Sequence, residues 1–123
     1  MRILNQAFRL YVEPDRLEST IAFYEAIQGK TCERRISIAE TGIEVAVIGG
    51  FILLAGSEQA LKPIRDAQAV LMVDSLDGLV PWLQVKGATI LHEPREAIGG
   101  RNLLVRHPDG LVAEYYEAAK VAP

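Results

Sequence analysis

Residues 7–13, Ala-Phe-Arg-Leu-Tyr-Val-Glu, return later in the chain as residues 68–74, Gln-Ala-Val-Leu-Met-Val-Asp. The apolar stretch 51–54 returns in the same way as 111–114, and a helical segment between the two strands is also repeated. Each match is weak alone, but three matches in the same order indicate an internal repeat. Internal repetition constrains the whole fold, so each half predicts the structure of the other.

Each half has the periodicity of a strand, a helix and three further strands. Alternation of apolar residues predicts strands, and the stripe Leu17, Ile21, Tyr24 predicts a helix that ends at Gly29. Asp15 and Glu18 have the spacing of a capping box at its start. In the first half the expected strands are 4–12, 31–38, 43–47 and 51–55. In the second half we expect strands 68–74, 88–92, 101–107 and 111–117, and a helix from about 77 to 86 with Pro81 in its first turn.

These elements predict one α+β domain over residues 1–123, built from two tandem βαβββ modules. Module one covers about 4–56 and module two about 67–118. The polar stretch 57–66, which contains Pro63, is too short for a unit of its own and is interpreted as a connector.

The composition excludes several classes of protein. A net charge of −3 and no basic cluster argue against nucleic-acid binding. Cys32 is the only cysteine, so the chain has no internal disulfide and no CxxC zinc pair. No apolar run is long enough for a membrane span or a signal peptide, so we expect a cytoplasmic protein.

The sequence resembles the vicinal oxygen chelate superfamily, which includes glyoxalase I, extradiol dioxygenases and bleomycin resistance proteins. The resemblance rests on the order of several motifs along essentially the whole chain. They are Ile21-Ala22-Phe23-Tyr24, Val73-Asp74-Ser75-Leu76-Asp77, Lys86-Gly87-Ala88, Gly99-Gly100-Arg101-Asn102 and Arg106-His107-Pro108-Asp109-Gly110-Leu111-Val112-Ala113-Glu114. It implies a cupped mixed sheet with helices on its convex side, a pocket on its concave face, and a homodimer.

Metal-dependent members of that superfamily bind one divalent ion through two side chains from each half. Strand periodicity places Ala7 at the first position, and a one-residue slip would place Gln6 there but turn Arg9 toward the helix-covered core. The other three positions are Leu54, Gln68 and Glu114. Since leucine and alanine cannot ligate a cation, we expect no metal cofactor, with a divalent metal site as the alternative.

Period-2 alternation places the other candidate site residues on the face of Gln68 and Glu114. An apolar face with a few polar groups is typical of a small-molecule site. Arg9 could hold a ligand carboxylate, or it could pair with Glu114, which is also the one candidate catalytic base. The expected ligand-binding pocket comprises Arg9, Tyr11, Leu54, Gln68, Met72, Asn102, Leu104, Glu114 and Tyr116.

These residues are compatible with three functions. The first is a metal-independent protein that binds a small organic ligand, with no nucleic-acid or membrane partner. The second is a divalent-metal lyase, isomerase or dioxygenase, and the third is an interaction protein whose pocket has filled in. Trp82 is expected in the core or a dimer contact, Cys32 as an inert thiol, and His92 and His107 as exposed loop residues outside the metal positions.

Overall fold

The computed structural model describes residues 1–120 and divides the chain into two compact units. The first unit is Ala7–Asp66, and the second unit is Met1–Gln6 together with the chain from Ala67 onward. Each unit combines a mixed sheet with a helix, which confirms the α+β class and the tandem βαβββ modules.

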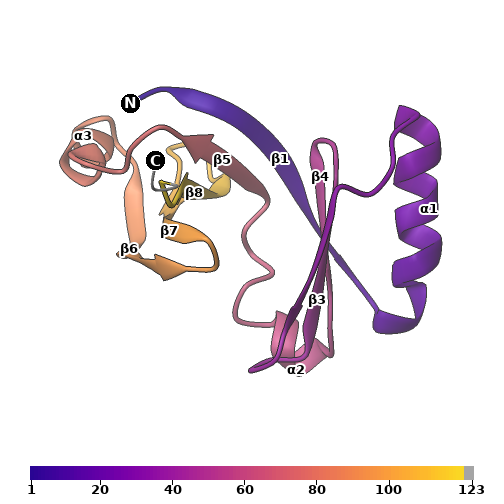
Figure 1. The fold of residues 1–123 in the computed structure, drawn as a ribbon. Helices are drawn as coiled ribbons and strands as arrows, with labels where there is room; N and C mark the ends of the chain where they lie inside the picture. Colours follow the sequence, from indigo (N-terminus) through magenta and orange to yellow (C-terminus); the bar gives the residue numbers. More distant parts are fainter. Residues whose placement is uncertain (121–123) are drawn as a thin grey trace. The chain divides into compact units, whose positions relative to one another are not determined.

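The first unit orders its strands β2-β3-β4-β1. β1 and β4 are parallel, with Phe8 opposite Phe51 and Tyr11 opposite Leu54, and the other neighbours are antiparallel. In Figure 1 these strands lie beside the long helix α1. The elements are β1 (Ile3–Val12), η1 (Pro14–Arg16), α1 (Leu17–Gln28), β2 (Arg34–Ile38), β3 (Ile43–Ile48), β4 (Phe51–Ala55) and α2 (Glu58–Leu61).

The second unit orders its strands β5-β8-β7-β6, and the first residues of β1 lie beside β5. There the backbone N–H of Asp74 donates to the carbonyl of Arg2 at 3.1 Å. β5 and β8 are parallel, with Val70 opposite Glu114. The elements are β5 (Ala69–Val73), α3 (Leu79–Val85), β6 (Thr89–Ala97), β7 (Gly100–Arg106) and β8 (Val112–Ala118), of which β7 and β8 are orange to yellow in Figure 1.

In each unit one helix covers one face of the sheet. In the first unit Leu17 and Ile21 of α1 form a buried cluster with residues that include Leu53 and Ala55 of β4. In the second unit Leu79 and Leu83 of α3 form a buried cluster with residues that include Leu103, Val105 and Tyr115. These clusters are the cores, and the faces of the sheets away from α1 and α3 are the places for the predicted site.

The helix boundaries agree with the sequence in two respects and differ in one. Gly29 ends α1 in the left-handed region with φ of 62°, and Pro81 lies in the first turn of α3, as predicted. The capping box is wrong. Asp15 lies inside the 3-10 turn that follows Pro14, and Arg16 precedes α1 without a side-chain cap. Pro14 begins the turn because its fixed φ suits a first helical position.

Two further expectations need correction. The stretch 57–66 contains the short helix α2, whose first turn is capped by Ser57: its Oγ accepts the N–H of Ala60 at 3.1 Å. The strand expected over 88–92 is longer than predicted, because β6 continues through Glu93 and Pro94 to Ala97, with irregular register near His92 and Arg95. Proline is tolerated there because β6 is an edge strand with a bulge, where no ladder hydrogen bond is lost.

Within residues 1–120, no helix is both long and apolar enough to cross a membrane.

Candidate ligand-binding site

Five of the predicted site residues lie together on the face of the second unit away from α3. The ladders arrange them in two rows across β7, β8 and β5. Their neighbours of opposite parity, such as Leu103 and Tyr115, are buried in the cluster with α3. One row is Asn102, Tyr116 and Met72, and the other is Leu104, Glu114 and Val70.

A hydrogen bond connects the polar members of the two rows. Asn102 Nδ2 donates to Glu114 Oε2 at 2.9 Å. The other end of the same amide is unusual, because Asn102 Oδ1 is buried and has no hydrogen-bond partner among the described residues. Buried polar atoms are nearly always paired, so a lone acceptor on a candidate binding face needs an explanation.

The side chains of Tyr116 and Gln68 each form a hydrogen bond with the backbone. The hydroxyl of Tyr116 donates to the carbonyl of Ile98 at 2.7 Å, and so fastens the β6–β7 turn to β8. The side-chain carbonyl of Gln68 accepts the N–H of Val112 at 3.2 Å, at the start of β8. The oxygen that would ligate a metal from this glutamine is therefore already bonded to the sheet.

In the first unit, Arg9, Tyr11 and Leu54 lie on the face away from α1. Leu10 and Val12, of opposite parity, pack with the α1 cluster. Arg9 Nε donates to the Tyr11 hydroxyl at 2.9 Å, and the guanidinium carbon lies 5.7 Å from the centre of the Tyr11 ring. The Tyr11 hydroxyl in turn donates to the carbonyl of Ile64 at 2.8 Å. This chain of contacts ties β1 to the segment that follows α2.

Sequence reasoning missed that α2 covers part of this face. Leu61 is only 4% exposed and forms a buried cluster with Ile43 and Leu54, against which Ala60 and Ile64 also pack. The apolar residues Leu61 and Ile64, three apart after a capping serine, were the signal of a short helix within the connector. Leu54 is thus a core residue beneath α2.

The donors at the four metal positions do not fit a divalent ion. Ala7 is buried and Gln6 is exposed, while Leu54 is covered by apolar side chains. Transition metals in proteins need nitrogen, oxygen or sulfur donors, which alanine and leucine lack. Among residues 1–120, no group of three or more His, Cys, Asp and Glu side chains is arranged to hold a metal.

The ladders also refine the alignment of the two halves. Leu54 lies opposite Tyr11, whereas Glu114 lies opposite Val70. If Leu54 and Glu114 are counterparts, the residue two positions earlier on the first strand is Arg9 in one half and Gln68 in the other. The residue in register with Gln68 is then Arg9 rather than Ala7. The positively charged guanidinium of Arg9 therefore occupies the position of a metal ligand.

His107 was expected to be an exposed loop residue, and the structure shows otherwise. It is half-buried, and its Nε2 is 2.8 Å from the hydroxyl of Tyr115. Burial raises the pKa of the Tyr115 hydroxyl. This contact anchors the β7–β8 turn to the core. His92 lies within β6, where its Nδ1 is 2.8 Å from the carbonyl of Glu93.

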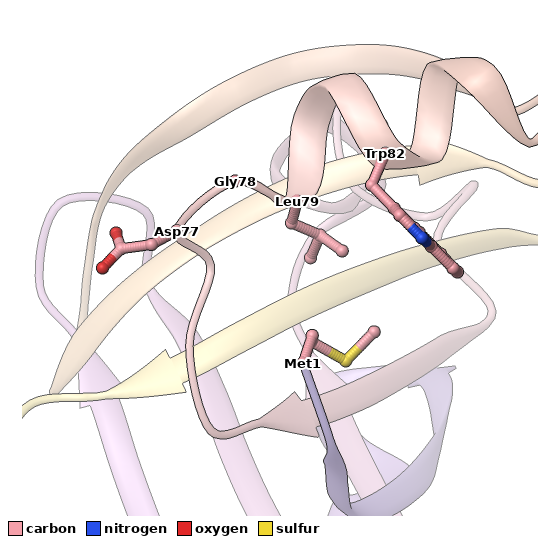
Figure 2. Close-up of a pocket in the computed structure, with 5 residues that line it drawn as sticks. All are labelled: Met1, Asp77, Gly78, Leu79 and Trp82. Carbon is pink, nitrogen blue, oxygen red and sulfur yellow. The ribbon is translucent and has the colours of Figure 1, made fainter.

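Two hollows lie elsewhere on the units. One of about 300 Å³ in the second unit is lined by Met1, Asp77, Gly78, Leu79 and Trp82. Figure 2 shows Trp82 directed from α3 toward Met1, with the carboxylate of Asp77 pointing away. Trp82 is 53% exposed, which excludes a place in the core and leaves the expected dimer contact as a prediction.

A second hollow, of about 340 Å³ in the first unit, lies at the carboxyl ends of β1 and β4. It is lined by Tyr11, Val12, Glu13, Gly56, Glu58, Leu61 and Arg65. Of the predicted site residues, Tyr11 is the one that lines it. The remaining residue singled out from the sequence, Cys32, is half-buried, with its Sγ 3.4 Å from the carbonyl of Arg34.

Comparison with solved structures finds a relative that matches this chain over its whole length. An uncharacterised protein from Methanosarcina mazei is 43% identical, and the match covers 100% of this chain and 98% of that chain with a TM-score of 0.84. No family model matches the chain, and no curated protein matches it.

More distant structures share the fold. Methylmalonyl-CoA epimerase from Mycobacterium tuberculosis is 20% identical with a TM-score of 0.72, over 96% of this chain and 90% of that one. The Streptomyces coelicolor epimerase (Q60A), in complex with 2-nitronate-propionyl-CoA, is 21% identical with a TM-score of 0.64, over 98% and 99%. At about one-fifth identity, the likeness to these epimerases shows a shared fold. At 43% identity over its whole length, the chain belongs to the same family as the uncharacterised Methanosarcina mazei protein.

Proposed function

We propose that this protein binds a small organic molecule on the face of its sheets away from α1 and α3, without a catalytic metal. The observation that carries the proposal is the pair of rows on the second unit. Apolar side chains there surround an amide and a carboxylate that are hydrogen-bonded to each other. A few polar groups within an apolar surface are what a small-molecule site needs for orientation and affinity.

The residues divide into apolar and polar roles. Met72 and Leu104 offer apolar contact area, and the unbranched methionine adapts to irregular ligands. Glu114 accepts hydrogen bonds from the ligand. Arg9 belongs to the first unit, where its positive charge is a separate candidate for binding a carboxylate. A homodimer, as the resemblance to the superfamily implies, is part of the proposal.

A divalent-metal lyase, isomerase or dioxygenase is the weaker candidate. It needs four donors, and Leu54 and Ala7 supply none. The Gln68 carbonyl is bonded to Val112, and Glu114 already accepts from Asn102. The epimerases share the fold at about one-fifth identity, which carries no activity to this chain.

A thermal-shift screen of organic compounds in the presence of EDTA tests the proposal. A ligand present at about 100 times its Kd stabilises a protein by about 2.7 kcal/mol, which for a domain of this size raises the Tm by roughly 10 °C. Glu114→Gln should weaken binding of the compounds that raise the Tm, while the matched substitution Glu96→Gln, at an exposed position on β6, should not.

Two results would refute the proposal. One is a screen in which no compound stabilises the EDTA-treated protein. The other is a set of ligands that bind only after a divalent metal is added back.

A further inference from the structure

Asn102 is held in one orientation by its neighbour. A carboxylate can only accept hydrogen bonds, so the amide must turn its Nδ2 toward Glu114, where the distance is 2.9 Å. The amide plane then directs Oδ1 away from Glu114. Rotating the amide by half a turn would place two acceptors against each other.

The oxygen at the other end of the amide is left buried without a donor among residues 1–120. A buried acceptor of this kind favours any molecule that brings it a hydrogen-bond donor, because the protein itself supplies none among the described residues. Since the atom is shielded from solvent here, the donor reaches it only when adjacent side chains move apart.

The composition of the two rows defines the chemistry of that molecule. Asn102 Oδ1 is an acceptor, and the Glu114 carboxylate bonded to the same amide is another. A ligand group placed here must therefore be a donor, and an anionic group would meet acceptors alone. Met72, Leu104 and Val70 provide apolar surface beside it.

We infer that Asn102 determines ligand specificity by accepting a hydrogen bond from an N–H or O–H group of the bound molecule. The inference rests on the proposed function and adds the class of ligand: an organic molecule with a hydrogen-bond donor attached to a compact apolar part. Glu114 acts as the positioning residue that keeps the Asn102 oxygen turned toward that donor.

A pair of probes that differ in one donor tests this inference. 2-Pyrrolidinone carries a ring N–H, and N-methyl-2-pyrrolidinone carries a methyl group in its place. Each is titrated into ¹⁵N-labelled protein, and the side-chain amide signals of Asn102 are followed. These signals are identified as the pair missing from the spectrum of Asn102→Leu. We expect 2-pyrrolidinone to shift them and to bind about tenfold more tightly than its methylated analogue, the usual effect of one buried hydrogen bond.

The variants supply the controls. Asn102→Leu, of similar volume, should bring the two affinities within about twofold of each other, because the acceptor is gone. Asn5→Leu, the same change at an exposed asparagine of the second unit, should keep the preference of the native protein. If Asn102→Leu does not fold, the ratio of the two probe affinities for the native protein decides alone.

Equal affinity of the native protein for both probes overturns the inference, and so does an Asn102 signal that neither probe shifts. A crystal structure of the pyrrolidinone complex with ordered water on Asn102 Oδ1 would also overturn it. In any of these cases, a screen that still finds Glu114-dependent ligands leaves the proposed function standing.

Discussion

Replacing Leu61 by alanine tests whether α2 truly closes over the sheet of the first unit. Leu61 is 4% exposed and packs with Ile43 and Leu54, so nearly all of its side chain leaves water on folding. The substitution removes three carbon atoms, worth about 0.8 kcal/mol each when buried. The cavity left behind raises the expected loss of unfolding free energy to roughly 2–4 kcal/mol.

The loss is measured by urea unfolding followed by far-ultraviolet circular dichroism, with an unchanged slope against urea. In a thermal melt the same loss corresponds to a Tm lower by roughly 8–16 °C, at about 4 °C for each kcal/mol. Leu4→Ala is the matched control. Leu4 is 55% exposed, so its truncation should cost about 1 kcal/mol or less.

A loss below about 0.5 kcal/mol for Leu61→Ala would refute the reasoning, because it is the range of ordinary surface substitutions. It would mean that the segment 57–66 is not packed on the sheet, and that the face around Leu54 is open.

Three further changes probe the second unit. Gly100→Ala should cost roughly 1–3 kcal/mol in a urea melt, because its Cβ would clash with the carbonyl oxygen of Glu117; an unchanged melt would contradict the close packing of β7 against β8. Tyr115→Phe should cost about 1 kcal/mol by removing the partner of His107, and equal stability would contradict that hydrogen bond. The N–H of Leu76 donates to Glu117 and lowers the pKa of its carboxyl, so this contribution is complete above the ordinary pKa of glutamate and is lost as the pH falls through the lowered value. On acidification, the free energy of unfolding should therefore decline less in Glu117→Gln than in the native protein. Parallel curves of unfolding free energy against pH for the two proteins would contradict the role given to Glu117.

The repeat and the alternation of apolar residues predicted most of the fold, because both are consequences of burial. Leu10 and Val12 pack toward α1 and Tyr11 away from it, as strand periodicity requires. The same alternation placed Asn102 and Glu114 on one face of the second unit.

The errors came from local chemistry that periodicity does not contain. Asp15 has the right spacing for a cap, yet Pro14 starts a 3-10 turn that takes Asp15 inside it. Pro94 reads as a break but is tolerated at the bulged edge of the sheet. His107 carries no sequence signal for its contact with Tyr115, since the strand register brings the two together.

The site was predictable only in part for the same reason. Alternation identifies which side chains share a face, but not which of their atoms lack a partner. The buried oxygen of Asn102 follows from the orientation that Glu114 imposes on the amide, and the cover over Leu54 follows from the path of the chain after β4. Neither is visible in a pattern of residue types.

The metal content of the protein, purified without chelators and measured by elemental analysis, tests the central claim most directly. With Ala7 or Arg9 at the first position and Leu54, Gln68 and Glu114 at the others, the donor set predicts zinc, nickel, manganese and iron well below one ion per chain. One metal ion per chain that is lost in Glu114→Ala would contradict the account. That result would favour a metal-dependent enzyme instead.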